Sequence, residues 1–259
     1  MLEFFQVGFS YPNAPADAPA LRNISFSLRS GTVTVLLGPN ASGKSTLLLL
    51  AAGLRKPRRG AVRLENRELT QWPPKSRARQ IAFLAQWNAV PDLTARELAA
   101  HGRYPHLSAR RVLGPRDREI IARALELTGA LAFADRQLGE LSGGQRQKAR
   151  LAMAVAQDTP ILLLDEPTTY LDVRVQLELA ETLRQLAAAG KTVLLALHDL
   201  PLALRCGDHA LLLQEGELLY DGAADALPRS GIIEQAFGIT GIERSNAQCL
   251  PGTGICPPK

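Results

Sequence analysis

The sequence has 259 residues, of which 46% are hydrophobic and 21% charged, and its formal net charge is +5. These proportions are typical of a folded domain and exclude an intrinsically disordered chain. No apolar run approaches the roughly 20 residues that a membrane-spanning helix needs, and the N-terminus lacks the basic-then-apolar layout of a signal peptide. We therefore expect a cytosolic protein, or one that binds a membrane only from its side.

The three cysteines, Cys206, Cys249 and Cys256, show no Cys-x-x-Cys pairing, which argues against a metal site or a disulfide framework. Cys206 is expected in the core. The basic clusters at 55–59 and 110–118 are open to nucleic acid, an acidic membrane surface or plain solvation. Because no aromatic residues are interleaved with these charges, solvated faces or membrane proximity are favoured.

Four short and almost continuously apolar runs predict strands that are buried on both faces: Thr32–Leu37, Gln80–Ala85, Ile161–Leu164 and Thr192–Leu197. Such strands, each followed by a helical pattern, indicate a parallel sheet covered by helices and therefore an α/β fold. Weaker, alternating runs predict a smaller antiparallel sheet beside the main one. These runs are Leu2–Phe9, Asn23–Leu28, Gly60–Leu64, and the pair Ala210–Gln214 and Glu217–Tyr220.

The run GPNASGKST, residues 38–46, follows a predicted buried strand and precedes an apolar helix predicted over Thr46–Gly53. Its Gly-x4-Gly-Lys-Ser spacing lets backbone N–H groups surround a phosphate, and the helix dipole adds to the attraction. Lys44 can reach the β and γ phosphates, and Ser45 can bind Mg²⁺. Ala41 occupies a place where glycine is frequent, which predicts that this position needs no positive φ. The expected nucleotide-binding residues are Gly38, Pro39, Asn40, Ala41, Ser42, Gly43, Lys44, Ser45 and Thr46.

This phosphate loop alone leaves kinases, motors, GTPases and transport ATPases open. The stretch from Trp87 to Arg150 has a helical pattern without strands, which predicts a helical insertion in the α/β core. Within it, Thr94-Ala-Arg-Glu97 predicts a capping box, and Gly102 is expected to end the helix that follows. A second helix is expected from about Asp117 to Leu127.

The run LSGGQRQKARLAMAVAQ occupies residues 141–157. Ser142, Gly143 and Gly144 would form a bare helix N-terminus, in which a hydroxyl and exposed N–H groups are suited to bind a terminal phosphate. A plain glycine-rich helix cap is the structural alternative at this point.

The run ILLLDEP, residues 161–167, is a buried strand that ends at Asp165 and Glu166. Open α/β sheets bind their ligands at this carboxyl edge. Asp165 is suited to hold Mg²⁺ through water, and Glu166 to polarise an attacking water. The sequence contains no Asn-Lys-x-Asp for reading guanine, and a small-molecule kinase would not need the second acid.

The phosphate loop, the LSGGQ run and the acidic strand end together closely resemble the ATP-binding subunit of ABC transporters, over roughly residues 3–240. The resemblance implies a P-loop NTPase (RecA-like) core with a parallel sheet, an antiparallel β subdomain and a helical insertion. It implies an ATP-binding domain over 1–240, with the insertion at about 88–150, and a loosely ordered tail over 241–259. It also implies ATP and Mg²⁺ as cofactors.

The resemblance assigns the remaining roles by position. Tyr11 resembles the aromatic residue that stacks on adenine, and Gln86 the glutamine that contacts Mg²⁺ or its water. His198 resembles the histidine that touches the γ-phosphate and acts with Glu166 in catalysis. Asp172 corresponds to the family's dimer-contact aspartate, and the ATP of a partner subunit would be contacted by Ser142, Gly143, Gly144 and Gln145.

In this family two subunits enclose two ATP molecules, so the resemblance implies a homodimer. It would be a peripheral protein on the cytoplasmic face of the inner (plasma) membrane, docked onto polytopic permease subunits. A substrate-binding protein belongs to the full system, and no nucleic acid is expected.

The segment TARELAAHGRYPHL, residues 94–107, resembles the importers of ferric siderophores, haem and cobalamin. The run EPTTYLD with Tyr170 and the AFGIT element at Ala236–Thr240 resemble the same branch. Val175 departs from it, because that branch often has histidine there. Ferric siderophore is the favoured substrate, with haem or cobalamin next.

The two histidines of this segment, His101 and His106, are separated by Gly102 and Pro105, and no acid or thiol accompanies them. This spacing disfavours a metal site. Because the ATP chemistry is accounted for elsewhere, the segment is predicted to contact the membrane subunit.

Three rival classes remain as alternatives to an importer subunit. An ABC ATPase of DNA repair or chromosomes would show long coiled coils, zinc cysteines or a second cassette. A nucleotide kinase would leave the residues 142–145 and His198 unexplained. An exporter half, or an ABC ATPase of another transporter class, would share the same motifs, although exporter halves usually carry their membrane helices on the same chain.

Overall fold

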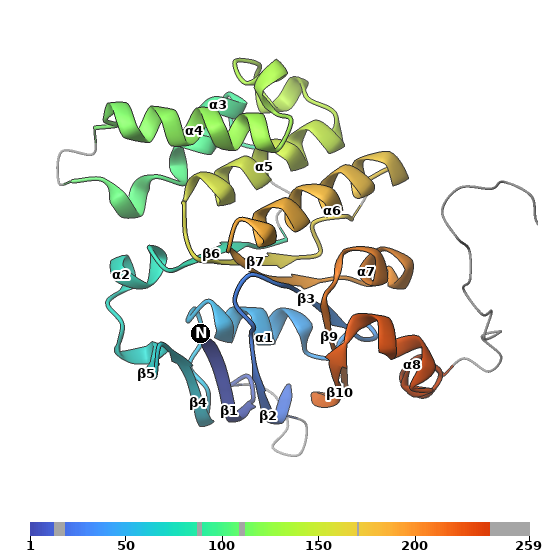
Figure 1. Cartoon of the computed structure of the whole chain (residues 1–259). Coiled ribbons are helices and arrows are strands. Elements are labelled where there is room, and N and C mark those ends of the chain that lie inside the picture. The colour runs from blue at the N-terminus through green and yellow to red at the C-terminus, as the bar shows by residue number, and fades with distance from the viewer. Residues whose placement is uncertain (13–18, 87–89, 109–111, 170, 239–259) are drawn as a thin grey trace, which may run out of the picture.

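The computed structural model describes residues 1–12, 19–86, 90–108, 112–169 and 171–238. Two sheets and a helical insertion make up this part of the chain (Figure 1). The predicted tail over 241–259, with Cys249 and Cys256, lies outside the described residues, and so do Tyr170 and the end of the AFGIT element.

The larger sheet has six strands in the order β10-β9-β3-β8-β7-β6. All neighbouring strands are parallel except β10, which pairs antiparallel with β9 at one edge. Every residue of β3, β7 and β8 is buried, which explains why these strands are continuously apolar in the sequence. The six strands are β3 (Val33–Leu37), β6 (Ile81–Leu84), β7 (Ile161–Asp165), β8 (Thr192–Ala196), β9 (His209–Gln214) and β10 (Glu217–Ala223).

The predicted hairpin after residue 209 was expected in the smaller sheet, and this prediction is wrong. Its first strand, β9, pairs in parallel with β3, and five of its six residues are buried. Only β10 is an edge strand with an exposed, alternating pattern. A hairpin pattern shows where two strands pair with each other but not which sheet they join, so this placement could not be predicted from the local pattern.

The smaller sheet is antiparallel, in the order β2-β1-β4-β5. Helix α1 (Lys44–Ala51) lies between the two sheets (Figure 1). One hydrophobic cluster joins its leucines to both sheets, for example Leu47 to Val62 and Leu163. The strands are β1 (Leu2–Phe9), β2 (Leu21–Ser27), β4 (Arg59–Leu64) and β5 (Arg67–Glu68).

Helix α1 begins and ends two residues before the predicted helix Thr46–Gly53. Its N-cap is Gly43 of the phosphate loop, so the loop leads into the helix without a spacer. It ends before Gly53 because that residue has φ 66, a left-handed conformation that stops a helix.

The other face of the large sheet is covered by helices from the second half of the chain. A second hydrophobic cluster packs their apolar sides on the sheet, and Cys206, only 2% exposed, belongs to it. Burial raises the pKa of the Cys206 thiol to about 11, which confirms a core residue and not a reactive one. The helices on this side are α6 (Val173–Ala188), α7 (Leu200–Cys206) and α8 (Ile232–Phe237), with the 3₁₀ segment η5 (Ala224–Arg229).

The stretch between β6 and β7 is helical, and its helices share a separate hydrophobic cluster. The predicted capping box is present, since the Glu97 amide donates to Thr94 Oγ1 and the Thr94 amide donates to the Glu97 carboxylate. Its helices are α3 (Ala95–His101), α4 (Pro115–Leu127) and α5 (Gly143–Ala156), with 3₁₀ turns η2 (Tyr104–His106), η3 (Leu131–Phe133) and η4 (Leu138–Glu140). The short η1 (Leu69–Gln71) and α2 (Pro74–Ala78) precede β6.

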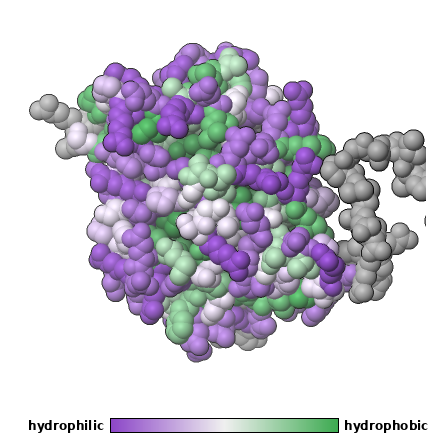
Figure 2. All heavy atoms as spheres, in the orientation of Figure 1, coloured by the Kyte–Doolittle hydropathy of each residue, from purple (hydrophilic) through white to green (hydrophobic). Residues whose placement is uncertain are grey.

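None of the helices in the described ranges is long and apolar enough to cross a membrane. The face shown in Figure 2 is largely hydrophilic, with apolar residues scattered among polar ones.

The packing of the helical insertion can be tested by substituting a buried and an exposed leucine within it. Leu125 is fully buried in the cluster between α3, α4 and α5, so Leu125→Ala should lower the free energy of unfolding by about 2–5 kcal/mol. Leu131 on η3 is 47% exposed, and Leu131→Ala should change it by less than about 0.5 kcal/mol. Denaturant unfolding of both variants measures the difference. Equal losses would contradict the packing described for the insertion.

Candidate functional site

The phosphate loop requires glycine at two positions for steric reasons. Gly38, which follows β3, has φ 147, and a Cβ there would lie 2.2 Å from the Leu213 carbonyl oxygen. Gly43 has φ 107, and a Cβ there would lie 2.7 Å from the Ala20 carbonyl oxygen. Because both contacts are with backbone, no other residue fits without moving a strand or its neighbours.

Ala41 has φ 63, so the prediction that this position needs no positive φ is wrong. The left-handed conformation is unfavourable for a residue with a Cβ, by about 1–2 kcal/mol. Ala41 is exposed, and the surrounding loop imposes its conformation. Ser42 contributes to this, because its carbonyl accepts the Gly216 amide from the β9–β10 turn at 3.1 Å.

Lys44 is the first residue of α1 and is only 6% exposed. Its Nζ donates to the carbonyl oxygens of Gly38 at 2.8 Å and Pro39 at 3.0 Å. Burial lowers the pKa of the Lys44 ammonium, whereas the charges of Glu166 and Asp165 act in the opposite direction. The N-cap, Gly43, supplies no side chain to the helix end, so the first N–H groups of α1 remain suited to an anion.

The strand β7 ends at Asp165, which is 8% exposed. The Ser45 hydroxyl bonds to its carboxylate, but the buried Asp165 Oδ1 has no hydrogen-bond partner among the described residues. Burial raises the pKa of the Asp165 carboxyl, with the Glu166 charge acting in the same direction and Ser45 and Lys44 against it.

An unpartnered carboxylate oxygen beside a hydroxyl is a set of oxygen ligands that Mg²⁺ prefers. A divalent cation here would also compensate the buried charge of Asp165. The residues present therefore fit the predicted metal.

Glu166 and His198 lie together at the same sheet edge. Glu166 has φ 47, and its amide donates to the Ala196 carbonyl at the end of β8. Glu166 Oε2 is 3.9 Å from His198 Nδ1, with the two side chains 21% and 53% exposed. A strained backbone at a carboxylate of this kind is typical of functional sites. Asp199, next to His198, caps α7 by accepting the Leu202 amide.

Tyr11 and Gln86 follow different strands, β1 and β6. The Tyr11 hydroxyl is 3.1 Å from Thr46 Oγ1 on α1, and its ring packs edge-on against Phe9. Tyr11 is 37% exposed, and the Arg55 guanidinium lies over its ring at 5.9 Å from the centroid, so a base could stack only on the part of the ring that Arg55 leaves open. Gln86 is exposed two residues beyond β6, and the chain that follows it, 87–89, lies outside the described residues.

The residues 142–145 form the N-terminus of α5. Ser142 is the N-cap, whose Oγ accepts the Gln145 amide, while the Gln145 side chain accepts the Ser142 amide. Ser142 and Gly143 are exposed, and a Cβ on Gly143 would meet nothing within 4 Å. Among the described residues, no hydrogen bond or ion pair joins this group to the phosphate loop.

Asp172 and Val175 stand at the start of α6. Asp172 is exposed and caps the helix by accepting the Val175 amide at 2.9 Å. The Val175 side chain lies beside Gly144, where an added Cβ would be 3.2 Å from it. The structure thus places the residue that departs from the expected branch pattern directly against the LSGGQ run.

Most of the Gly-Arg-Tyr-Pro-His turn is buried or partly buried. Arg103 is 5% exposed, whereas Tyr104 is 58% exposed and its ring lies 4.8 Å from that of His101. His106 bonds to the Gln157 carbonyl. The described part of the chain holds no group of three or more His, Cys, Asp or Glu that could bind a metal.

Sequence reasoning missed two supports of the site. The β9–β10 hairpin touches the phosphate loop through Gly216 of its turn and Leu213 of β9, and nothing in a hairpin pattern predicts that contact. Asp117 pairs with the buried Arg103. The sequence feature that could have indicated a role for Asp117 is an acidic residue in the first turn of a helix that begins with Gly-Pro.

Comparisons with known proteins agree with this geometry. Residues 21–169 match the family described as ABC transporter. The chain is 39% identical to the iron(3+)-hydroxamate import ATP-binding protein FhuC of Bacillus subtilis, over 90% of this chain and 86% of that protein. It is 43% identical to the hemin import ATP-binding protein HmuV of Pseudomonas entomophila, over 77% of this chain and 79% of that protein.

Among solved structures, a dimeric bacterial ABC transporter cassette is similar, with a TM-score of 0.77 and 30% identity. The match covers 86% of this chain and 99% of that one. Fold, phosphate loop and relatives agree, and the chain belongs to the ABC transporter family as one of its ATP-binding, ATP-hydrolysing subunits.

Proposed function

We propose that this chain hydrolyses ATP to power the import of an iron chelate, with a ferric siderophore as the favoured substrate. The observation that carries this is the identity of 39% with a hydroxamate importer subunit over most of both chains. The 43% identity with a hemin importer subunit favours haem as the second candidate. Cobalamin remains the third.

For the chemistry, Glu166 polarises the water that attacks the γ-phosphate, and His198 contacts that phosphate. Their 3.9 Å approach at one sheet edge supports a shared task. The residues that would hold Mg²⁺ are Ser45, Asp165 and Gln86, and the metal would neutralise charge on the phosphates. Gly38–Thr46 would bind the phosphates, with Tyr11 stacking on the base.

For assembly, we propose a homodimer in which residues 142–145 of one copy complete the nucleotide site of the other. This is supported by the exposure of Ser142 and Gly143, and by the lack, in the part of the chain that the structure describes, of any bond from residues 142–145 to the phosphate loop. Asp172, exposed at the start of α6, would lie at the same interface.

The dimer would dock on polytopic permease subunits at the cytoplasmic face of the inner membrane, in a system that also has a substrate-binding protein. Tyr104, stacked on His101 and exposed on the insertion, is the contact we assign to the permease. We take residues 1–240 as the ATP-binding domain, 88–150 as its insertion and 241–259 as a tail. No nucleic acid is needed.

The substrate is tested by uptake in cells that lack this chain. Uptake of a ferric siderophore should be lost, whereas haem and cobalamin uptake continue. Restoring the wild-type chain should recover uptake, and restoring Glu166→Gln should not. Loss of haem uptake alone would replace the siderophore assignment with haem, and loss of neither would contradict iron-chelate import.

Glu166→Gln tests the base. We expect ATP turnover to fall about 100-fold or more because the carboxylate no longer polarises the water, while ATP binding persists and the closed dimer accumulates. Lys44→Ala should instead weaken nucleotide binding itself. Steady-state turnover and equilibrium binding distinguish the two variants. Near wild-type turnover by Glu166→Gln would contradict the assignment.

Asp165→Asn separates metal binding from folding. Because burial raises the pKa of Asp165, its charge weakens the fold above that pKa, and protonation on acidification relieves the penalty. At pH 7 the amide should therefore maintain or raise the melting temperature of the protein without nucleotide.

The same variant should lose the stabilisation by Mg-ATP, which for the wild type is about 2.7 kcal/mol at a ligand concentration 100 times Kd. Thermal unfolding with and without Mg-ATP measures both effects. Asp158→Asn, which changes an exposed partner of Lys191, is the control. Full Mg-ATP stabilisation of Asp165→Asn would contradict its role at the metal.

A further inference from the structure

The Gly-Arg-Tyr-Pro-His turn, residues 102–106, lies against the C-terminal end of α5. A Cβ on Gly102 would be 2.2 Å from the Met153 carbonyl oxygen and 2.9 Å from the Gln157 amide nitrogen. Only glycine permits this approach, because both contacts are with the backbone of the last turn of the helix. The turn and the helix end therefore pack as one unit.

Arg103 binds the end of α5 and the beginning of α4 at once. Its Nη1 donates to the Ala156 carbonyl at 2.9 Å, and its Nε donates to Asp117 Oδ1 at 2.9 Å. The guanidinium thus sits at the negative end of α5, and Asp117 stands in the first turn of α4, which is positive. Both charges favour the helix dipoles beside them.

His106 and Gln157 extend the contact to the large sheet. His106 Nε2 donates to the Gln157 carbonyl at 2.8 Å. The Gln157 side chain donates to the carbonyl of Ala78, at the end of α2, and to that of Ile81, at the start of the strand β6 that leads to Gln86. From the other side, Arg79 Nε donates to the Pro105 carbonyl at 2.9 Å.

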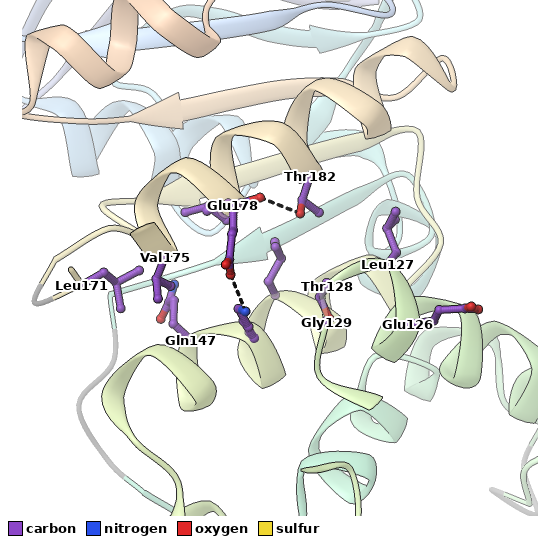
Figure 3. A pocket seen from close by; sticks show the side chains of 12 residues that line it. Glu126, Leu127, Thr128, Gly129, Gln147, Leu171, Val175, Glu178 and Thr182 are labelled. Carbon is purple, nitrogen blue, oxygen red and sulfur yellow. Dashed lines mark hydrogen bonds and ion pairs between the residues drawn. The ribbon is translucent and has the colours of Figure 1, made fainter. Parts of the chain in front are cut away.

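The N-terminal half of α5 is held more loosely than its C-terminal half, since the buried residues of the helix all lie from Ala149 onward. A cavity of about 230 Å³ lies beside it, lined by residues of α4, α5 and α6 (Figure 3). Lys148 of α5 and Glu178 of α6 form an ion pair at 2.6 Å, with side chains 26% and 39% exposed. A partly exposed ion pair of this kind contributes little. The position of α5 is therefore fixed by its second half, where its buried side chains pack and where Gly102 and Arg103 meet its C-terminal end.

Because α5 is long, a small change in its tilt at the C-terminal end displaces its N-terminus by a larger distance. Fourteen residues span about 21 Å at ~1.5 Å per residue. A tilt of about 5° at the C-terminus would then displace Ser142 by about 2 Å, which exceeds the range of ~0.5 Å in hydrogen-bond length. Residues 142–145 can meet a phosphate only if the far end of the helix is fixed.

We propose that Arg103 is a positioning residue for ATP hydrolysis: by fixing the C-terminal end of α5, it places Ser142–Gln145 on the nucleotide of the partner subunit. His106 supports it through Gln157. The inference rests on the proposed role of residues 142–145 in the dimer. It assigns the buried part of the turn to the hydrolytic site, and leaves Tyr104 as the part that faces outward.

Arg103→Lys tests this in the purified full-length protein. Lysine keeps a charge beside Asp117, but one ammonium nitrogen cannot occupy the positions of both Nε and Nη1. We expect turnover at saturating ATP to fall about tenfold, as for loss of one hydrogen bond from a charged donor, while the Kd for ATP stays near wild type. Because the lost bond is buried, the melting temperature should also fall by several degrees, with the protein still folded at the assay temperature. The matched control is Arg96→Lys, the same change in an exposed ion pair of the insertion, which should leave turnover unchanged.

A second pair of variants, at His106, keeps the inference testable if Arg103→Lys does not fold. His106→Leu removes the donor to Gln157 and should lower turnover, whereas His106→Gln retains a donor and should restore it. Wild-type turnover by folded Arg103→Lys overturns the inference. If Arg103→Lys does not fold, wild-type turnover by His106→Leu overturns it, and so does an equal effect of Leu and Gln.

Gly143→Asp distinguishes this inference from the function beneath it. The site has room for the side chain, and an acid suits a helix N-terminus, so the fold should persist while the charge repels a phosphate. Wild-type turnover by Gly143→Asp would overturn the proposed role of residues 142–145 and the inference with it. If Gly143→Asp loses turnover while Arg103→Lys keeps wild-type turnover, the inference about Arg103 is overturned and the proposed role of residues 142–145 stands.

Discussion

The close packing of α1 between two sheets is the constraint on which the rest of the molecule depends. Its leucines contact both sheets, so the helix cannot shift without opening the core. Its N-terminus is therefore fixed at the edge where β3, β7 and β8 end. Parallel strands bring Asp165, Glu166 and His198 to that edge, although 33 residues separate the first from the last in the chain. The phosphate loop and the acids meet because the sheet is parallel.

The structure divides the hydrolytic machinery between a rigid part and a part carried by the insertion. Lys44 and Asp165 are buried and bonded within the core. Ser142 is exposed at the tip of α5, which packs partly in the cluster of the insertion, through Ala149 and Ala152, and partly on the large sheet, through Leu151 and Ala154. One part can bind nucleotide alone, and the other depends on the orientation of a whole helix.

Much of this architecture could be predicted from residues alone. The four apolar runs became β3, β6, β7 and β8, the capping box at Thr94 is present, and Cys206 is in the core. These features are local, since they depend on side-chain patterns within a few residues. The phosphate loop and the acidic strand end were predicted for the same reason.

The predictions that were wrong concern features that depend on backbone contacts between residues far apart in the sequence. The strand β9 pairs with one edge of β3 in the large sheet. A local sequence pattern does not indicate which strand will be the partner. Ala41 has a positive φ because contacts elsewhere in the loop impose it. The packing of the Gly-Arg-Tyr-Pro-His turn on α5 was not predicted, since the bonds of Arg103 and His106 reach residues 14 to 53 positions away. The contact of this segment with a membrane subunit stays a prediction.

The turn between β9 and β10 has a wider consequence. Gly216 donates to the Ser42 carbonyl and accepts the Arg22 amide, so one residue connects the phosphate loop, the small sheet and the C-terminal hairpin. Any ligand that orders the loop must also stabilise that hairpin, and the effect is reciprocal because the two equilibria are thermodynamically linked. Backbone amides near residue 216 should then exchange with solvent more slowly when nucleotide is bound. Amide exchange in the β9–β10 turn, which carries no catalytic group, would thus measure whether nucleotide is bound at the phosphate loop.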